Sequence, residues 1–550
     1  MNIQEAKEEI IRTVRAYLAK DETGNYLIPR EKQRPLLLIG APGIGKTAVM
    51  RQAAEELGIS LVSYTITHHT RQSAVGLPVV SEKEYGGRRY SVTEYTMSEI
   101  IASVYDQIER SGLAEGILFL DEINCVSETL APTMLQFLQY KTFGAHQVPE
   151  GYVIVTAGNP PEYNKSVRDF DIVTLDRVRR LDVKEDFPVW KRYALRNGVH
   201  GAVLSYLEIK KDRFYSVQAS IRGKRFVTAR GWEDLSDTLR AYEKLGFPVG
   251  QELVQSFLQE PETAEDFSLY YVLYRKYREK YRIPELLAGS IPAEARALKQ
   301  APFDEKLSLI SLLVAALGQE FREWEEELMV QRQLFSLLKE LHAELRAGRE
   351  LSAAEWIEER LSEWRVVFRK KQEAKLFSRE EEKRERLAAA RLAELLFLLR
   401  TATGTDATKS ETAGITEATK TETSKTEEAA VTGEAVTTGE TSVTEQAEKT
   451  HGAEAVWQYA RLKEHFSALE ERRNVRVREI GTHLDNAFHF LAEVFGEQQE
   501  MVLFLSELDA GYHSLHFVRE TGNESYYRYN KILLLKDRRE ELKEEVMRLL

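Results

Sequence analysis

Cysteine is almost missing from this sequence, and so are the marks of an exported or membrane-spanning chain. Its 550 residues include one cysteine, Cys125, which excludes an internal disulfide framework and suits a reducing compartment. Residues 1–20 place glutamates among the apolar positions and form no signal-peptide core. The longest apolar run, residues 307–317, is too short to cross a bilayer. We therefore expect a cytoplasmic protein without a membrane span, in which this run is a buried helix.

The sequence also has no excess of positive charge. Its formal net charge is −12, which argues against a surface that coats nucleic acid, although a local basic patch is still compatible with it. Hydrophobic residues make up 43% of the chain, enough for buried cores. The length corresponds to about three or four domains.

Aromatic residues are missing altogether from one long segment. Residues 401–450 contain none, and about a third of them are threonine, mixed with Ala, Glu, Gly and Lys. Such a composition buries too little apolar surface to offset the loss of chain entropy on folding. We expect residues 401–450 to form a disordered linker.

What the chain does contain is a glycine-rich run that fits the pattern G-x-x-x-x-G-K-[ST]. Residues 35–39 before it predict a buried strand, and residues 47–57 after it predict a helix. Backbone N–H groups in such a loop, together with the helix N-terminus, favour a bound phosphate. Lys46 should reach the β- and γ-phosphates, and the Thr47 hydroxyl should bind Mg²⁺. The predicted nucleotide-binding residues are Gly40, Ala41, Pro42, Gly43, Ile44, Gly45, Lys46 and Thr47.

Two further strand ends carry polar groups suited to phosphate chemistry. Residues 117–120 are apolar and run into Asp121 and Glu122. We expect Asp121 to bind Mg²⁺ and Glu122 to orient and polarise the attacking water. Asn159 follows the apolar run 152–157, where it could hydrogen-bond the water or the γ-phosphate. A turn before Pro160 is the structural alternative for Asn159.

Strands and helices alternate over this region. Expected strands at 35–39, 61–67, 117–120, 152–157 and 180–183 predict a parallel sheet with helices on both faces. Residues 82–95, with two central glycines, predict an inserted β-hairpin, and residues 142–151 a second one. From residue 188 onward the pattern is helical.

These motifs together resemble the AAA+ ATPases, and the two hairpins and residues 61–78 resemble the MoxR or dynein-related branch. The resemblance implies a P-loop core with a five-stranded parallel sheet, a helical lid and a homo-oligomeric ring, usually a hexamer. It implies ATP and Mg²⁺ as cofactors at sites between subunits. It also implies an arginine finger, for which Arg177 is our candidate, with Arg179 and Arg180 as competitors and a structural salt bridge as the alternative.

Arg230 is the candidate for a residue of the lid that acts at the nucleotide site. It follows Thr228, a suitable N-cap, and a cation at a helix start is disfavoured by the helix dipole, which invites a functional reason. The segment resembles the start of the lid helix that carries the residue called sensor 2 in AAA+ proteins.

The expected organisation has six parts. They are an N-terminal helix and linker (1–30), an αβα nucleotide-binding domain (31–187), a helical lid (188–285), a charged helical region (286–400), the disordered linker (401–450) and a C-terminal helical domain (451–550).

The resemblance favours an ATP-driven machine that remodels or activates a protein client, with a partner bearing a von Willebrand factor A domain. A nucleic-acid motor is the first alternative, but the acidic charge balance argues against it and the isolated pair Arg88 and Arg89 gives it little support. A nucleotide-gated scaffold with little turnover is the second, and the presence of Lys46, Asp121 and Glu122 argues against it.

Overall fold

The computed structural model divides into two compact units. It describes residues 1–68, 74, 76–143, 145–163, 170, 172–220, 223–346, 352–373, 376–377, 379–417 and 440–532, with the backbone alone at 68, 219–220, 223–224, 345–346, 379, 401–417 and 440–457. The first unit comprises Met1–Phe321 and Ile480–Leu550, and the second comprises Arg322–Glu479. The division falls inside two long helices, α14 (Phe303–Arg346) and α17 (Glu440–Phe495), and does not coincide with the boundaries at 285, 400 and 450 expected from the sequence.

A five-stranded parallel sheet forms the core of the first unit, as predicted. Its order is β2-β5-β8-β1-β9, so the strand that precedes the glycine-rich loop lies between two strands from later in the chain. The strands are β1 (Leu36–Gly40), β2 (Ser60–Thr65), β5 (Gly116–Asp121), β8 (Tyr152–Gly158) and β9 (Arg179–Val183).

Helices cover both faces of this sheet because its central strands are apolar on both sides. Leu36 and Leu38 pack in one core cluster with α1 (Ile3–Leu18) and α2 (Lys46–Leu57). Leu37 and Ile39 pack in another with α4 (Glu99–Ser111) and α5 (Ala131–Tyr140). The alternation follows from the twofold repeat of a strand. Short elements complete this part: η1 (Arg30–Lys32), η2 (Ile66–His68), η3 (Ile123–Cys125) and α6 (Ile172–Arg177).

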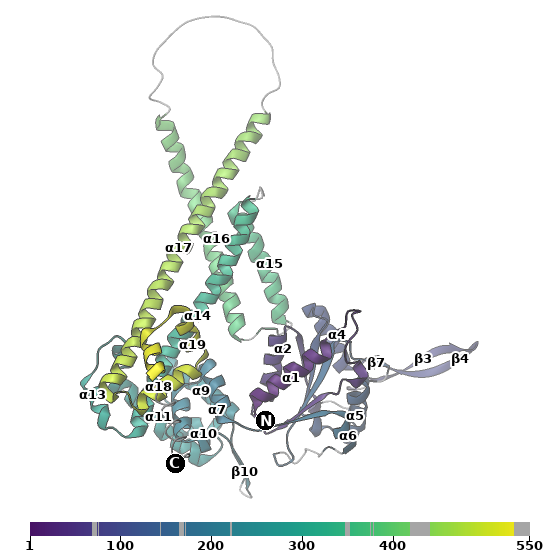
Figure 1. Ribbon diagram of the computed structural model, residues 1–550. Helices are drawn as coiled ribbons and strands as arrows, with labels where there is room; N and C mark the ends of the chain where they lie inside the picture. The colour runs from purple at the N-terminus through teal and green to yellow at the C-terminus, as the bar shows by residue number, and fades with distance from the viewer. Residues whose placement is uncertain are drawn as a thin grey trace, which may run out of the picture. The chain divides into compact units, whose positions relative to one another are not determined.

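The first predicted hairpin is present and begins earlier than expected. Strands β3 (Pro78–Tyr85) and β4 (Arg88–Tyr95) pair antiparallel and extend from the sheet domain as a ribbon (Figure 1). Gly86 and Gly87 at its tip both have positive φ, as the turn of a two-residue hairpin requires. The second hairpin is minimal, β6 (Thr142–Phe143) with β7 (His146–Gln147). Residues 69–73 and 75, within the segment 61–78 used above, lie outside the described residues.

The region after the sheet is mainly helical, with one difference from expectation. Strands β10 (Ser216–Ser220) and β11 (Gly223–Val227) pair antiparallel within it. The alternating pattern of residues 216–227 favours strands once they pair with each other. The helices are α7 (Phe187–Arg196), α8 (Gly201–Ile209), η4 (Lys211–Arg213), α9 (Ala229–Leu245), α10 (Gln251–Phe257), α11 (Pro261–Tyr281), α12 (Ile283–Leu287), α13 (Ala293–Arg296) and η5 (Ala297–Gln300).

C-terminal helices return to this lid. The end of α17, α18 (Gln499–Ala510) and α19 (Tyr512–Thr521) belong to the same compact unit as the lid. The rings of Phe321 and Phe517 lie 5.0 Å apart, and Asn486 Nδ2 donates to the Leu287 carbonyl at 2.7 Å. The first part of α14, the apolar run 307–317, is buried here as predicted.

The second unit is a helical bundle with its own apolar core. Its helices are the distal part of α14, α15 (Ala353–Glu373), α16 (Arg379–Glu417) and the first part of α17. Trp356, Leu395 and Leu462 are among the side chains that build the core. Helical backbone extends into both ends of the expected linker 401–450, because a nucleated helix propagates at little cost. Residues 418–439, the middle of the expected linker, lie outside the described residues. Over the described part of the chain, no helix is apolar and long enough to cross a membrane.

Candidate active site

The glycine-rich loop joins β1 to α2 at the carboxyl edge of the sheet. Gly45 is the N-cap of α2 and has φ 97°, a conformation open to glycine at little cost. Gly43 also has positive φ, and a Cβ there would lie 2.9 Å from the Thr228 Cβ. The loop therefore needs glycine both to turn and to let the lid approach.

Lys46 is buried at the start of α2 and points back into the loop. Its Nζ donates to the carbonyls of Gly40 at 2.7 Å and Ala41 at 2.9 Å, and to Asn159 Oδ1 at 2.8 Å. Burial lowers the pKa of Lys46 to about 8, Asp121 opposes this shift and Arg230 adds to it. A lysine held this way is a preformed positive charge at the place where a phosphate would bind.

The two carboxylates predicted from the sequence stand at the end of β5. Thr47 Oγ1 donates to Asp121 Oδ2 at 2.9 Å, so the first turn of α2 meets the Asp121 carboxylate. The other oxygen of Asp121 accepts from the Glu122 backbone N–H at 2.9 Å. Glu122 has φ 57°, an uncommon value for a residue with a side chain. Backbone strain of this kind is often retained at functional sites.

Asn159 lies where the sequence predicted it. It follows β8, which stands between β5 and β1 in the sheet, so its side chain lies between Asp121 and the loop. Its Oδ1 accepts from Lys46, and its backbone carbonyl accepts from Asn124 Nδ2 at 2.7 Å. The structure thus brings Lys46, Thr47, Asp121, Glu122 and Asn159 together at one edge of the sheet.

The lid reaches the same loop through the start of α9. Thr228 caps this helix by accepting from the Gly231 N–H at 3.2 Å, as the sequence predicted. The Arg230 N–H donates to the Gly43 carbonyl at 3.3 Å, and the exposed Arg230 side chain is near enough to lower the pKa of Lys46. The lid residue predicted to act at the site is therefore located beside it.

The three candidate arginines differ in their contacts. Arg179 donates to Thr13 Oγ1 at 2.8 Å and pairs with Glu9, and Arg180 pairs with Asp182 at 2.8 Å. Arg177, the last residue of α6, is half-buried and makes no ion pair or hydrogen bond to any other residue that the structure describes. Of the three, Arg177 is the guanidinium left available.

Arg177 lies at the amino edge of the sheet, opposite to the edge that carries the glycine-rich loop of the same chain. It precedes β9, in which Arg179 pairs with Leu36 and Val183 pairs with Gly40. The loop begins at Gly40, at the other end of β1, which places it roughly 13 Å farther along the strand direction. A role at this chain's own nucleotide site is therefore not supported by the fold.

Two contacts at the site had no clear signal in the sequence. Asn124 is 5% exposed and fastens the Asn159 backbone, yet in the sequence it is one polar residue in a loop. Tyr215 OH donates to the Pro42 carbonyl at 2.9 Å, and burial raises the Tyr215 pKa. Both contacts join segments far apart in the chain, so no local pattern could have marked them.

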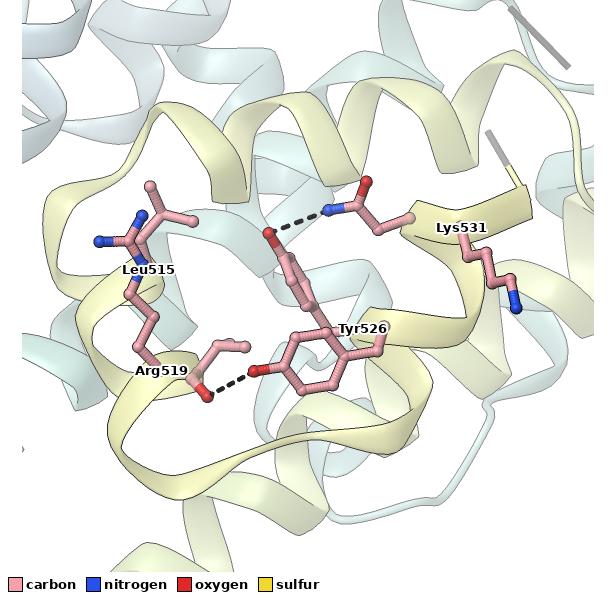
Figure 2. Close-up of a pocket in the computed structure, with 7 residues that line it drawn as sticks. Leu515, Arg519, Tyr526 and Lys531 are labelled. Carbon is pink, nitrogen blue, oxygen red and sulfur yellow. Dashed lines mark hydrogen bonds between the residues drawn. The ribbon is translucent and has the colours of Figure 1, made fainter. Parts of the chain in front are cut away.

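A separate cavity of about 340 Å³ lies among the C-terminal helices and shares no residue with the loop. Tyr526 OH accepts from Asn530 Nδ2 at 3.2 Å, and Tyr527 OH donates to the Val518 carbonyl at 3.2 Å, as Figure 2 shows. Its hydroxyls and amide are thus already engaged with the protein. The lining residues are Leu515, Val518, Arg519, Tyr526, Tyr527, Asn530 and Lys531. This cavity lacks the convergent reactive groups that the loop site has.

Comparison with known families agrees with the geometry of the loop site. Residues 36–175 match the AAA family, the ATPase family associated with various cellular activities. The chain carries an AAA-family ATPase domain. This match spans β1 to α6, the segment that supplies Lys46, Asp121, Glu122 and Asn159. AAA ATPases bind nucleotide, and the fold around this P-loop is that of an AAA+ domain followed by a mostly helical region.

The chain spans only a small part of the curated relative that it matches. The Lon protease of Metamycoplasma arthritidis (strain 158L3-1) is 31% identical over 122 residues, which are 22% of this chain and 13% of the relative. Among solved structures, a point mutant of Thermotoga maritima RuvB has a TM-score of 0.28 and 15% identity, covering 54% of this chain and 84% of that chain. The AAA domain of FIGL-1 in complex with ADP has a TM-score of 0.27 and 14% identity, covering 48% and 79%.

Proposed function

We propose that the AAA domain hydrolyses ATP with Mg²⁺ at the loop site. The observation that carries this proposal is the connected set of contacts in which Lys46 binds Asn159 and Thr47 binds Asp121 at the carboxyl edge of the sheet. Lys46 and the loop amides hold the phosphates, Glu122 orients and polarises water, and Asn159 keeps Lys46 directed at the γ-phosphate.

The donor set at Thr47 and Asp121 fits Mg²⁺. Magnesium prefers oxygen ligands in octahedral geometry at about 2.0–2.1 Å, so two neighbouring ligands lie roughly 2.9 Å apart. Thr47 Oγ1 and Asp121 Oδ2 are separated by 2.9 Å. These two residues would hold the ion, which neutralises charge on the phosphates.

We further propose that the site is completed by a neighbouring copy of the chain in a ring, as in the hexamers of related proteins. Arg177 has no partner among the described residues and is displaced from its own loop along β9, so it suits a phosphate on a neighbour. A guanidinium matches the charge that develops on the transferred phosphoryl group. Arg230 would act at its own loop from the lid, reporting nucleotide to the helical region.

The finer role is remodelling of a protein client, in the manner of MoxR-like proteins and with a partner that bears a von Willebrand factor A domain. The similarity to a protein named Lon protease supports a protein as the substrate. The chain spans 13% of that relative's length. The β3–β4 ribbon, exposed along most of both strands, is a suitable client contact.

Glu122→Gln tests the proposal because it keeps the shape of the side chain and removes the base. We expect it to bind ATP and to lose hydrolysis, and to retain a protein partner in a pull-down with ATP. Lys46→Ala is the matched control, since it should bind neither nucleotide nor the partner. Phosphate release at equal rates by wild type and Lys46→Ala would refute the ATPase. Stimulation by DNA without a protein partner would instead favour a nucleic-acid motor.

A further inference from the structure

Asn124 occupies a buried position directly behind the proposed catalytic residues. It lies in η3, two residues after Glu122, and is 5% exposed. Its Nδ2 donates to the Asn159 carbonyl at 2.7 Å, while the Asn159 side chain accepts from Lys46 at 2.8 Å. One carboxamide therefore links the turn that carries Glu122 to the residue that touches Lys46.

The side-chain oxygen of Asn124 makes no hydrogen bond in this position. Its Oδ1 is buried and has no hydrogen-bond partner among the described residues. Rotating the amide by half a turn would set Oδ1 against the Asn159 carbonyl, two acceptors in contact. The orientation is therefore dictated by Asn159. A buried oxygen without a hydrogen bond lowers the stability of the fold. Stability therefore does not explain why an asparagine occupies position 124.

Gly158 makes room for this contact. A Cβ at residue 158 would lie 2.6 Å from Asn124 Oδ1 and 2.9 Å from its Cγ, closer than atoms approach without displacement. Gly158 is the last residue of β8 and has no positive φ, so space and not backbone freedom accounts for glycine there. The missing side chain of Gly158 thus leaves the space that the buried Asn124 amide occupies.

We propose that Asn124 is a positioning residue, seated against Gly158, which holds Asn159 so that its side chain meets Lys46. It acts through Asn159 and does not touch the nucleotide. The expected effect on turnover rests on the proposed ATPase function, but the effect on Lys46 does not.

Asn124→Ala and Gly158→Ala test the proposal from opposite sides of the contact. Each should lower kcat for ATP roughly 10- to 100-fold, the range for groups that orient a site residue, and change KM much less. The double variant should be no worse than the more severe single variant, because both changes break one contact. Asn197→Ala is the matched control, since its Nδ2 makes a similar bond to the Tyr193 carbonyl at 2.9 Å on the surface.

A second measurement needs no nucleotide. Amine labelling followed by mass spectrometry compares Lys46 with Lys141, another buried lysine, which donates to the Arg30 carbonyl at 2.9 Å away from the loop. In both variants Lys46 should be labelled faster while Lys141 keeps its wild-type rate. An unchanged Lys46, a parallel rise at Lys141, or additive losses of kcat would overturn the proposal. If the wild type fails to hydrolyse ATP, the ATPase proposal falls and the labelling ratio still decides the role of Asn124.

Discussion

Lys46 combines burial with three acceptors, and this determines how the site responds to pH. Its pKa is lowered to about 8, first by burial, although Asp121 opposes the shift. Only the charged amine attracts phosphate, so binding of a nucleotide must raise this pKa.

Nucleotide affinity should therefore depend on pH. We expect it to be constant below about pH 8 and to fall by up to tenfold per unit above it, as free Lys46 loses its proton. The second phosphate ionisation, near pH 6, is complete over this range and adds no slope. Titration of a fluorescent nucleotide from pH 7 to 10 measures the effect, and Lys46→Gln should bind weakly with no such slope. An affinity that rises with pH would contradict the assignment.

Glu122 shows the conflict between stability and function at a single residue. Its left-handed backbone is unfavourable for a residue with a Cβ, and glycine relieves that strain.

We expect the free energy of unfolding in urea to be about 1 kcal/mol higher for Glu122→Gly than for Glu122→Ala. Both variants should abolish ATP hydrolysis. Both variants lack the carboxylate, so the difference between them isolates the backbone. Equal stability of the two would show that the conformation is not strained.

At the scale of elements, α7 is joined to the returning C-terminal helices by a buried ion pair. Lys191 Nζ contacts Glu208 at 2.7 Å and also pairs with Glu507 of α18, and all three side chains are at most 20% exposed. Burial lowers the Lys191 pKa, but the two carboxylates outweigh it and hold the pKa above its usual value. Trp190, the preceding residue, donates to Glu233 of α9 at 2.9 Å. The helix that contacts the P-loop is thereby connected to α18.

Lys191→Met should loosen α18 from the lid, because it leaves the buried Glu507 carboxylate without its cation and leaves Glu208 with the exposed Lys211 alone. Breaking such a pair costs about 3–5 kcal/mol. Hydrogen exchange of residues 499–521 measures the effect. Lys211→Met is the control: Lys211 also contacts Glu208, but it is 61% exposed and should contribute less than about 1 kcal/mol. Equal exchange in the two variants would mean that the ion pair does not hold α18.

At the scale of the whole molecule, the proposed ring requires that one chain completes the site of another. Arg177→Ala should bind nucleotide normally and hydrolyse it about a thousandfold more slowly. Mixed with Lys46→Ala, which is inactive but keeps Arg177, it should recover activity, since some sites then pair an intact Lys46 with an intact arginine. ATPase assays of each variant and of the mixture decide the matter.

Arg179→Ala is the matched control for this experiment. Arg179 is held by Glu9 and Thr13 of α1, so its loss should leave hydrolysis within a few-fold of wild type. A mixture that stays inactive, or an Arg179 variant as impaired as Arg177→Ala, would refute the assignment of Arg177.

Local patterns in the sequence were enough to predict the sheet strands, the β3–β4 hairpin and the grouping of Lys46, Asp121 and Asn159. The physical reason is that the carboxyl ends of neighbouring parallel strands meet at one edge, so polar residues that follow apolar runs converge there. The β10–β11 hairpin was missed because it lies inside a helical region. The backbone hydrogen bonds of its two strands form only when the strands pair with each other.

The sequence by itself determined a P-loop ATPase core, through glycines, a lysine and carboxylates at spacings that follow from chain geometry. Only the tertiary structure distinguished Arg177 from Arg179 and Arg180, seated Asn124 against Gly158, and returned α18 to the lid. These contacts join residues distant in the chain. Their partners are selected by packing and burial, and no spacing along one strand or helix encodes them.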